Sequence, residues 1–225
     1  MKKILPPPPA PAAGAPKRPR GRPRSFDREQ ALDKAMDVFW SKGFEAASLA
    51  DLTDAMGINP PSLYAAFGDK EGLFIEAVKR YYKNVTEQCE CPAETARESM
   101  EGFLTELAKV FTDTSHPRGC LGVMAMTTAL AGSPKMQAFL VEKRNNAKAM
   151  LRARIQQGIE DGEVPADTDA GALANFFSAV INGMSLQARD GASRKSLLAM
   201  VETAMRAWPE APKGKSRLRA AAAAD

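Results

Sequence analysis

The side chains with the clearest potential for chemistry in this 225-residue sequence are its three cysteines and its single histidine. Cys89 and Cys91 form a C-x-C pair, and His116 and Cys120 form an H-x₃-C pair. Such soft ligands can in principle hold zinc or copper(I), but the spacing matches no recognised zinc signature. We therefore expect no metal and no cofactor. The cysteines suit a reducing compartment and give no disulfide framework.

Cys120 has the most suggestive context of the three. The sequence HPRGC places it shortly after Pro117 and Arg118, which predicts the first turn of a helix. There the helix N-terminus and the guanidinium would lower the pKa of the thiol and favour the reactive thiolate. A redox- or electrophile-sensing thiol is one hypothesis for Cys120. A buried, inert cysteine is the other, and it is the one we favour.

Enzymatic chemistry lacks the residues that it would need. One histidine leaves no Ser-His-Asp or Cys-His pair in a convincing context, and there is no glycine-rich phosphate loop, HExxH motif or paired-carboxylate motif in a plausible cleft. We do not expect an enzyme.

A second group of side chains suits hydrogen bonding rather than bond making. Asn59, Ser62 and Tyr64 follow one another closely, and Lys70 comes soon after them. Short polar side chains can bind base edges, and a phenol or an ammonium can bind phosphate, when a helix presents them to the major groove of DNA.

The sequence around these residues predicts two short helices joined by a tight turn. Ser48 and Asp51 form a capping-box-like start, and Gly57 stands where a helix ends in the left-handed conformation. Asn59 and Pro60 then suit the N-cap and N1 positions of a second helix. This is the spacing of a helix-turn-helix, whose second helix would enter the major groove.

Positive charge concentrates at the N-terminus. Residues 1–26 carry +7, against +4 for the whole chain, so the rest of the chain is net acidic. We expect the Pro-rich residues 1–25 to be a disordered basic arm. Its PRGRP segment resembles an AT-hook, in which arginines lie in a narrow A·T minor groove, while a generic arm attracted by phosphates is the alternative. Either way, the arm would bind DNA through Arg20, Arg22 and Arg24.

The order of these segments resembles the TetR family of bacterial transcriptional repressors. The resemblance lies in KGFEAASLADLTDAMGI, SLYAAF and GDKEGLF within residues 26–82, with GEVPADTD at 162–169 also familiar. It implies an all-α fold with an N-terminal three-helix helix-turn-helix DNA-binding domain at 26–82. A larger helical effector-binding and dimerisation domain would occupy 83–208, and 209–225 would be a disordered tail.

By position, the resemblance implies DNA contacts at Ser48, Asn59, Ser62, Tyr64 and Lys70. Tyr64 and Lys70 would anchor phosphates, whereas Asn59 and Ser62 would lie at the end that faces the groove. Pro60 and Pro61 stand where the family often has a basic residue and a glycine. A lysine contact to guanine is therefore missing, which makes the arm relatively more important.

Residues 170–188 carry no charge and raise the question of a membrane span. Polar residues interrupt the segment while its apolar residues keep a helical stripe, so we interpret it as a buried or interface helix. In the TetR-like arrangement the last two long helices pair with their copies in a homodimer. The residues expected at that interface are Leu173, Phe176, Phe177, Val180, Met184, Leu197, Val201 and Met205.

An effector pocket would lie between the remaining helices, with methionine as an adaptable lining and threonine as a polar handle. For each single residue, plain core packing is the alternative. The candidates are Phe103, Leu107, Cys120, Met124, Thr127, Phe139, Met150, Phe176 and Phe177.

Together these features predict a DNA-binding transcriptional regulator. We expect a cytoplasmic homodimer, without a signal peptide or a membrane span, that represses from a palindromic operator in double-stranded DNA. An unknown small-molecule effector would release it. A thiol-based redox- or electrophile-sensing regulator that uses Cys120 is one alternative, and an architectural DNA-binding protein that uses the AT-hook-like arm is another.

Overall fold

The computed structural model describes residues 26–89, 93–128 and 133–210, and for 126–128 the backbone only. Within these ranges the chain is helical and has no strand, which confirms the predicted all-α class. The helices are α1 (Arg28–Ala46), α2 (Leu49–Met56), α3 (Pro60–Phe67), α4 (Lys70–Gln88), α5 (Ala96–Thr112), α6 (Leu121–Thr128), α7 (Pro134–Glu160), α8 (Ala170–Arg189) and α9 (Arg194–Met205).

Local capping sets the ends of α2 and the start of α3. The Ser48 hydroxyl accepts a hydrogen bond from the Asp51 N–H at 3.0 Å, and the Asp51 carboxylate accepts one from the Ser48 N–H at 3.0 Å. This is the predicted capping box. Gly57 ends α2 in the left-handed conformation, with φ 64° and ψ 33°. Asn59 caps α3, because its Oδ1 accepts a hydrogen bond from the Ser62 N–H at 2.9 Å.

Two helix boundaries have clear local causes. Gly43 takes φ 78° and ψ 171° inside α1, and helical turns resume after it as far as Ala46. Glycine permits this conformation, so α1 bends there instead of ending. In addition, α8 begins after Asp169, which is its N-cap. The Asp169 carboxylate accepts two first-turn N–H groups, at 2.8 and 2.9 Å.

Ion pairs fix α4 against α1. The Arg80 guanidinium binds the Asp33 carboxylate through two hydrogen bonds of 3.0 Å each and also pairs with Glu29. Arg28 pairs with Glu76 at 2.6 Å. Partly exposed pairs of this kind add little stability, so their main effect is to set the orientation of the two helices.

Aromatic packing supplies the core beneath these pairs. The rings of Phe39 from α1 and Phe74 from α4 meet edge to face with centroids 5.1 Å apart, and both side chains are fully buried. Leu63 on α3 is also fully buried. The helix-turn-helix therefore packs on a hydrophobic core to which α1, α3 and α4 all contribute.

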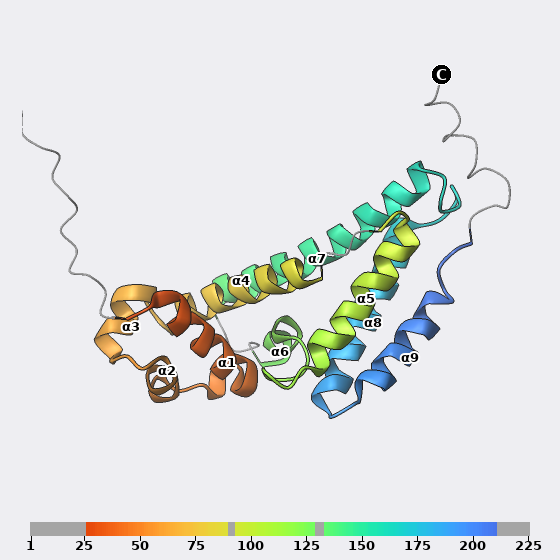
Figure 1. The fold of residues 1–225 in the computed structure, drawn as a ribbon. Coiled ribbons are helices and arrows are strands. Elements are labelled where there is room, and N and C mark those ends of the chain that lie inside the picture. Colours follow the sequence, from red (N-terminus) through yellow and green to blue (C-terminus); the bar gives the residue numbers. More distant parts are fainter. Residues whose placement is uncertain (1–25, 90–92, 129–132, 211–225) are drawn as a thin grey trace, which may run out of the picture.

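Helix α4 connects the two ends of the molecule (Figure 1). The N-terminal unit, which we define as α1–α3, lies at one end, and α5, α8 and α9 pack together at the other. Helix α7 runs along α4 and packs on α8, while α6 contacts α1. None of the helices in the described ranges is both long and apolar enough to cross a lipid bilayer.

Candidate nucleic-acid interface and cavity

Helix α3 presents the side chains that the sequence singled out. Leu63 and Phe67 are buried, at 0% and 6% exposure, and hold one face of the helix on the core. Tyr64 is 45% exposed and Asn59 is also exposed. Because the Asn59 Oδ1 caps the helix, its amide NH₂ group is the part left for a partner. Ser62 is half-buried beside the cap.

Lys70 is the first residue of α4, after the N-cap Asp69. Its ammonium lies 4.6 Å from the centroid of the Phe44 ring and 3.4 Å from the Glu45 carbonyl oxygen. The ring and the carbonyl position the charge next to the end of α1. Helix α4 can start this close to α3 only because Gly72 has no side chain, since a Cβ there would stand 2.4 Å from the Phe67 carbonyl oxygen.

Ser48 and Asp51 form a compact polar group at the start of α2. The Lys42 ammonium lies 2.6 Å from the Asp51 carboxylate. This hydrogen bond, together with those from Ser48, holds the pKa of Asp51 far below its ordinary value. The carboxylate is therefore ionised, and the ammonium offsets its charge on the surface that carries the helix-turn-helix.

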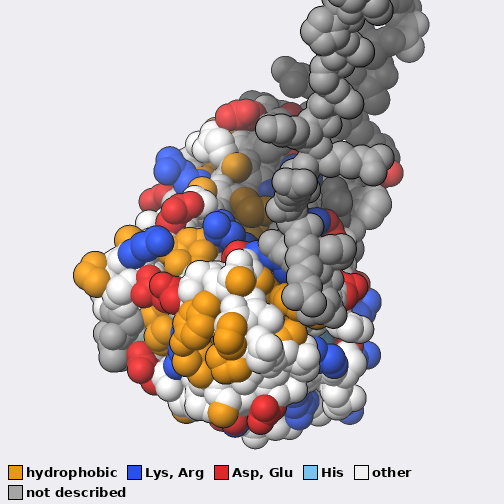
Figure 2. All heavy atoms as spheres, turned by 90° about the vertical axis from the view of Figure 1, so that its left-hand side faces the viewer, with side chains coloured by type: hydrophobic (Ala, Val, Ile, Leu, Met, Phe, Trp, Pro, Cys, Tyr) orange, Lys and Arg blue, Asp and Glu red, His pale blue; other side chains and the backbone are white. Residues whose placement is uncertain are grey.

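The exposed face of the N-terminal unit is not uniformly positive. In Figure 2, which faces this end of the molecule, apolar side chains gather near the centre, and both cationic and acidic side chains surround them. The arginines of the predicted arm, Arg20, Arg22 and Arg24, lie outside the described residues.

A cavity of about 610 Å³ lies among α4, α5, α7, α8 and the start of α6. Four of the nine predicted pocket residues line it: Phe103, Leu107, Cys120 and Met150. The side chain of Thr127 lies outside what the structure describes.

This cavity is not lined by the other four pocket candidates, Met124, Phe139, Phe176 and Phe177. Phe139 lies beneath two lysines, with their ammonium groups 5.8 and 5.5 Å from its ring centroid. Phe176 points outward at 40% exposure, and Phe177 packs on Trp208 within the core. Apolar periodicity places such residues on a helix but does not say which neighbour they face.

The sequence did not predict most of the other residues that line the cavity. Several of them are polar, aromatic or charged, among them Tyr81, Tyr82, Ser99, Arg144, Lys148, Arg154, Ser178 and Asn182. On a helix, charged residues at these spacings normally face water, so their charge alone does not predict that the cations of α7 line a cavity. A weak signal is the i, i+4 spacing of Arg144 and Lys148 with the buried Leu151 three residues further on, which places the three side chains on one face of the helix.

The surroundings of Cys120 oppose the hypothesis of a reactive thiolate and agree with the buried cysteine that the sequence analysis favoured. The residue is 8% exposed, and burial raises the pKa of its thiol, although the Tyr81 hydroxyl and nearby backbone N–H groups act in the opposite direction. Arg118 does not assist, because its guanidinium donates a 2.7 Å hydrogen bond to the Ala192 carbonyl instead. Cys120 therefore lines the cavity as a neutral thiol.

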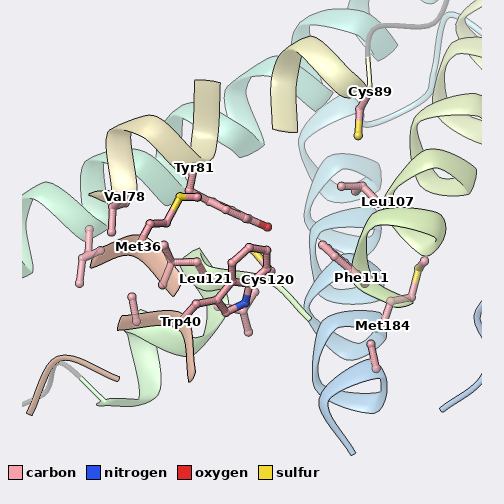
Figure 3. Close-up of a cluster of buried hydrophobic side chains, with 14 of the residues drawn as sticks. Met36, Trp40, Val78, Tyr81, Cys89, Leu107, Phe111, Cys120, Leu121 and Met184 are labelled. Carbon is pink, nitrogen blue, oxygen red and sulfur yellow. The ribbon is translucent and has the colours of Figure 1, made fainter. Parts of the chain in front are cut away.

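Tyr81 connects the cavity with α1. Its side chain points toward Trp40 and Cys120 (Figure 3), and the Tyr81 and Trp40 rings meet edge to face with centroids 4.9 Å apart. The residue is 2% exposed, and no described residue forms a hydrogen bond of normal geometry with its hydroxyl. Burial raises the pKa of this phenol well above its ordinary value, so it is a neutral hydrogen-bond donor in the cavity wall.

Five of the eight residues predicted at the dimer interface pack inside the protomer instead. Their exposure is 3% or less, so they have no surface to offer a partner: Phe177, Met184, Leu197, Val201 and Met205. The other three of the eight, Leu173, Phe176 and Val180, reach the surface, and all three belong to α8. Phe176 and Val180 border a shallow depression with five residues of α9, Ser196, Ala199, Met200, Thr203 and Ala204.

Among the described residues, no three His, Cys, Asp or Glu side chains gather as metal ligands would. Cys91, one member of the predicted C-x-C pair, lies outside those residues.

Two family models match the chain. The one for bacterial regulatory proteins of the tetR family matches residues 31–77, and the one for the tetracyclin repressor-like C-terminal domain matches residues 96–203.

Whole proteins resemble it as well. The HTH-type transcriptional repressor ComR of Escherichia coli (strain K12) is 37% identical over 86% of this chain and 94% of its own length. The HTH-type transcriptional repressor BdcR of the same strain is 33% identical, over 80% and 87% of the two chains. A cysteine mutant of the TetR family transcriptional regulator CifR, solved with 26-bp double-strand operator DNA, is 47% identical with a TM-score of 0.76, covering 84% of this chain and 100% of that one.

Proposed function

Because the chain belongs to the TetR family of bacterial regulatory proteins, we propose that it is a DNA-binding transcriptional repressor whose operator affinity falls when a small molecule occupies the cavity. The observation that carries this proposal is the pairing of two features in one chain. One is a helix-turn-helix whose second helix exposes polar and aromatic side chains. The other is a cavity of about 610 Å³ whose wall contacts α1.

Helix α3 is the proposed recognition helix. The amide of Asn59 and the hydroxyl of Ser62 would bind base edges, since both stand at its N-terminal end. Tyr64 and Lys70 would bind phosphates on either side of the groove, and Ser48 would do so at the start of α2. The surface exposure of Tyr64 and Asn59 supports these roles.

The basic arm would supply the positive charge that α3 lacks. Helix α3 has no Lys or Arg of its own. Arg20, Arg22 and Arg24 therefore account for a large part of the proposed phosphate or minor-groove binding.

We place the homodimer contact on the outward face of α8 and α9. Phe176, Val180 and Met200 expose apolar surface there, around a shallow depression. Two-fold pairing through this face would let two copies of α3 bind successive major grooves on the same side of the DNA.

The proposed release depends on a difference in affinity. A compound lowers operator affinity only if it binds the DNA-free conformation better than the DNA-bound one, and a 100-fold loss corresponds to about 2.7 kcal/mol of coupling. A thermal-shift screen of apolar compounds identifies those that bind. Titration of each hit against DNA that the protein selects from a random pool then tests release, and stabilising compounds that never alter DNA affinity would contradict the proposal.

A further inference from the structure

The cavity has an uneven charge distribution. Among the described residues that line it, three are cationic, Arg144, Lys148 and Arg154, and all of them come from α7. No Asp or Glu is among the described residues of the lining. None of the three cations forms an ion pair with a described carboxylate. Among the described residues, these positive charges therefore have no carboxylate counter-charge, and the other described walls of the cavity are largely apolar.

Arg144 and Lys148 form the natural binding pair within this group. They are one helical turn apart and about 6 Å apart along the α7 axis, whereas Arg154 lies about 9 Å beyond Lys148. Arg144 is also close enough to Tyr82 for its charge to act on the phenol. Tyr82 can occupy this place because Gly122 faces it, since a Cβ on Gly122 would stand 2.4 Å from the Tyr82 hydroxyl.

Apolar side chains from α5, α6, α7 and α8 form the rest of the wall. They include Met100, Phe103, Leu107, Phe111, Val123, Leu151 and Ile181. Such a wall favours an apolar body of small-molecule size, and the cavity volume falls within the range of ordinary ligand sites.

We infer that the ligand of this cavity is an organic carboxylate with an apolar body, its carboxylate bound by Arg144 and Lys148. The inference rests on the proposed function for the existence of a ligand and adds its chemical class. A guanidinium binds a carboxylate through two parallel hydrogen bonds, and the second cation adds attraction from the next turn. A neutral alcohol leaves both cations without a counter-charge, and an ammonium is repelled by them.

Three probes of equal chain length test the inference: decanoate, decan-1-ol and decylamine. Calorimetric titration of the full chain without DNA gives the dissociation constant of each. We expect decanoate to bind about tenfold or more tightly than decan-1-ol, because hydrogen bonds to charged groups are the stronger kind, and decylamine to bind most weakly. Equal or tighter binding of decan-1-ol or decylamine would overturn the inference, and so would the absence of binding by all three.

Matched substitutions on α7 locate the contact. Arg144→Gln and Lys148→Gln should each weaken decanoate binding about tenfold and leave decan-1-ol within about twofold. Arg152→Gln is the control, because Arg152 is exposed on the same helix and does not line the cavity. Equal losses for Arg152→Gln and Arg144→Gln would contradict the assignment, as would no loss for Arg144→Gln and Lys148→Gln.

Operator binding, measured separately, distinguishes this inference from the proposed function. If decanoate binds more tightly than decan-1-ol and decylamine but does not change operator affinity, the inferred ligand class stands and the release proposal fails. If another compound releases the operator while decanoate binds no better than decan-1-ol, the release proposal stands and the ligand class is wrong.

Discussion

The indole of Trp40 stacks on the imidazole of His116, with ring centroids 4.5 Å apart and 18° between the ring planes. Trp40 belongs to α1, whereas His116 lies in the segment before α6. Trp40 also connects His116 with the cavity, because the Tyr81 ring meets Trp40 edge to face and Tyr81 lines the cavity wall. Arg189 at the end of α8 also donates hydrogen bonds to the Trp40 and Ser41 carbonyls, at 3.1 and 2.6 Å. The N-terminal unit is therefore attached through α1 as well as through α4.

His116→Ala should weaken the coupling between the cavity and DNA. Removing the ring deletes the stack on Trp40, so we expect the DNA affinity of the ligand-free protein to change by less than about twofold, while the coupling free energy falls by about 0.5–2 kcal/mol. The measurement is the DNA dissociation constant with and without a bound releasing compound. His116→Phe keeps a stacking ring and should retain the coupling. If His116→Ala and His116→Phe have the same coupling free energy, the ring stack has no role in the coupling.

Lys70→Ala should weaken binding to all DNA sequences alike. A phosphate contact carries no sequence information, so base preference should stay the same while the slope of log K against log salt falls by about one unit. Anisotropy titrations over a salt series measure both. Lys79→Ala is the matched control, because Lys79 lies further along α4 over the Phe139 ring. Should Lys70→Ala change base preference and leave the salt slope intact, its assignment as a phosphate anchor is wrong.

Asn59 has two roles that different substitutions separate. Asn59→Ala removes the cap on the Ser62 N–H and should reduce the free energy of unfolding by about 0.5–2 kcal/mol. Asn59→Asp keeps a capping oxygen but loses the amide donor. It should therefore unfold like the wild type and still relax preference at one or two base pairs per half-site, by about 1–3 kcal/mol. If Asn59→Asp leaves the base preference unchanged, Asn59 caps α3 and does not contact a base.

Much of the N-terminal unit is predictable because its signals are local. The caps at Ser48, Asn59 and Asp69 depend on residues at most three positions away, and the structure contains all three. The cavity depends instead on which long helices meet. Arg144 resembles a solvated surface residue until α7 is packed against α4 and α5, and Phe177 is equally apolar whether it faces its own core or a second copy. Periodicity identifies a face of a helix and leaves its neighbour undetermined.

Cys120 should react slowly with alkylating agents near neutral pH. Burial raises the pKa of its thiol, so the thiolate is the minor form below about pH 8.5, and the alkylation rate should rise about tenfold per pH unit from pH 7 to 8.5. Iodoacetamide labelling followed by mass spectrometry, in a chain with Cys89→Ser and Cys91→Ser, measures this rate. The same chain in urea should react faster at pH 7.5. A rate that levels off by pH 7 would restore the low-pKa thiol and the sensing hypothesis attached to it.

Selection of bound duplexes from a random-sequence DNA pool by the purified full chain shows whether the protein binds a specific operator as a dimer. We expect enrichment of one pseudopalindrome, whose half-sites are centred about one helical turn, or a multiple of it, apart, because two copies of α3 related by a two-fold axis must bind the same side of the DNA. Substituting Tyr64 by Ala should lower recovery without changing the selected sequence. Enrichment of a single unpaired half-site, or of A·T-rich DNA without any palindrome, would contradict a dimeric operator-binding repressor.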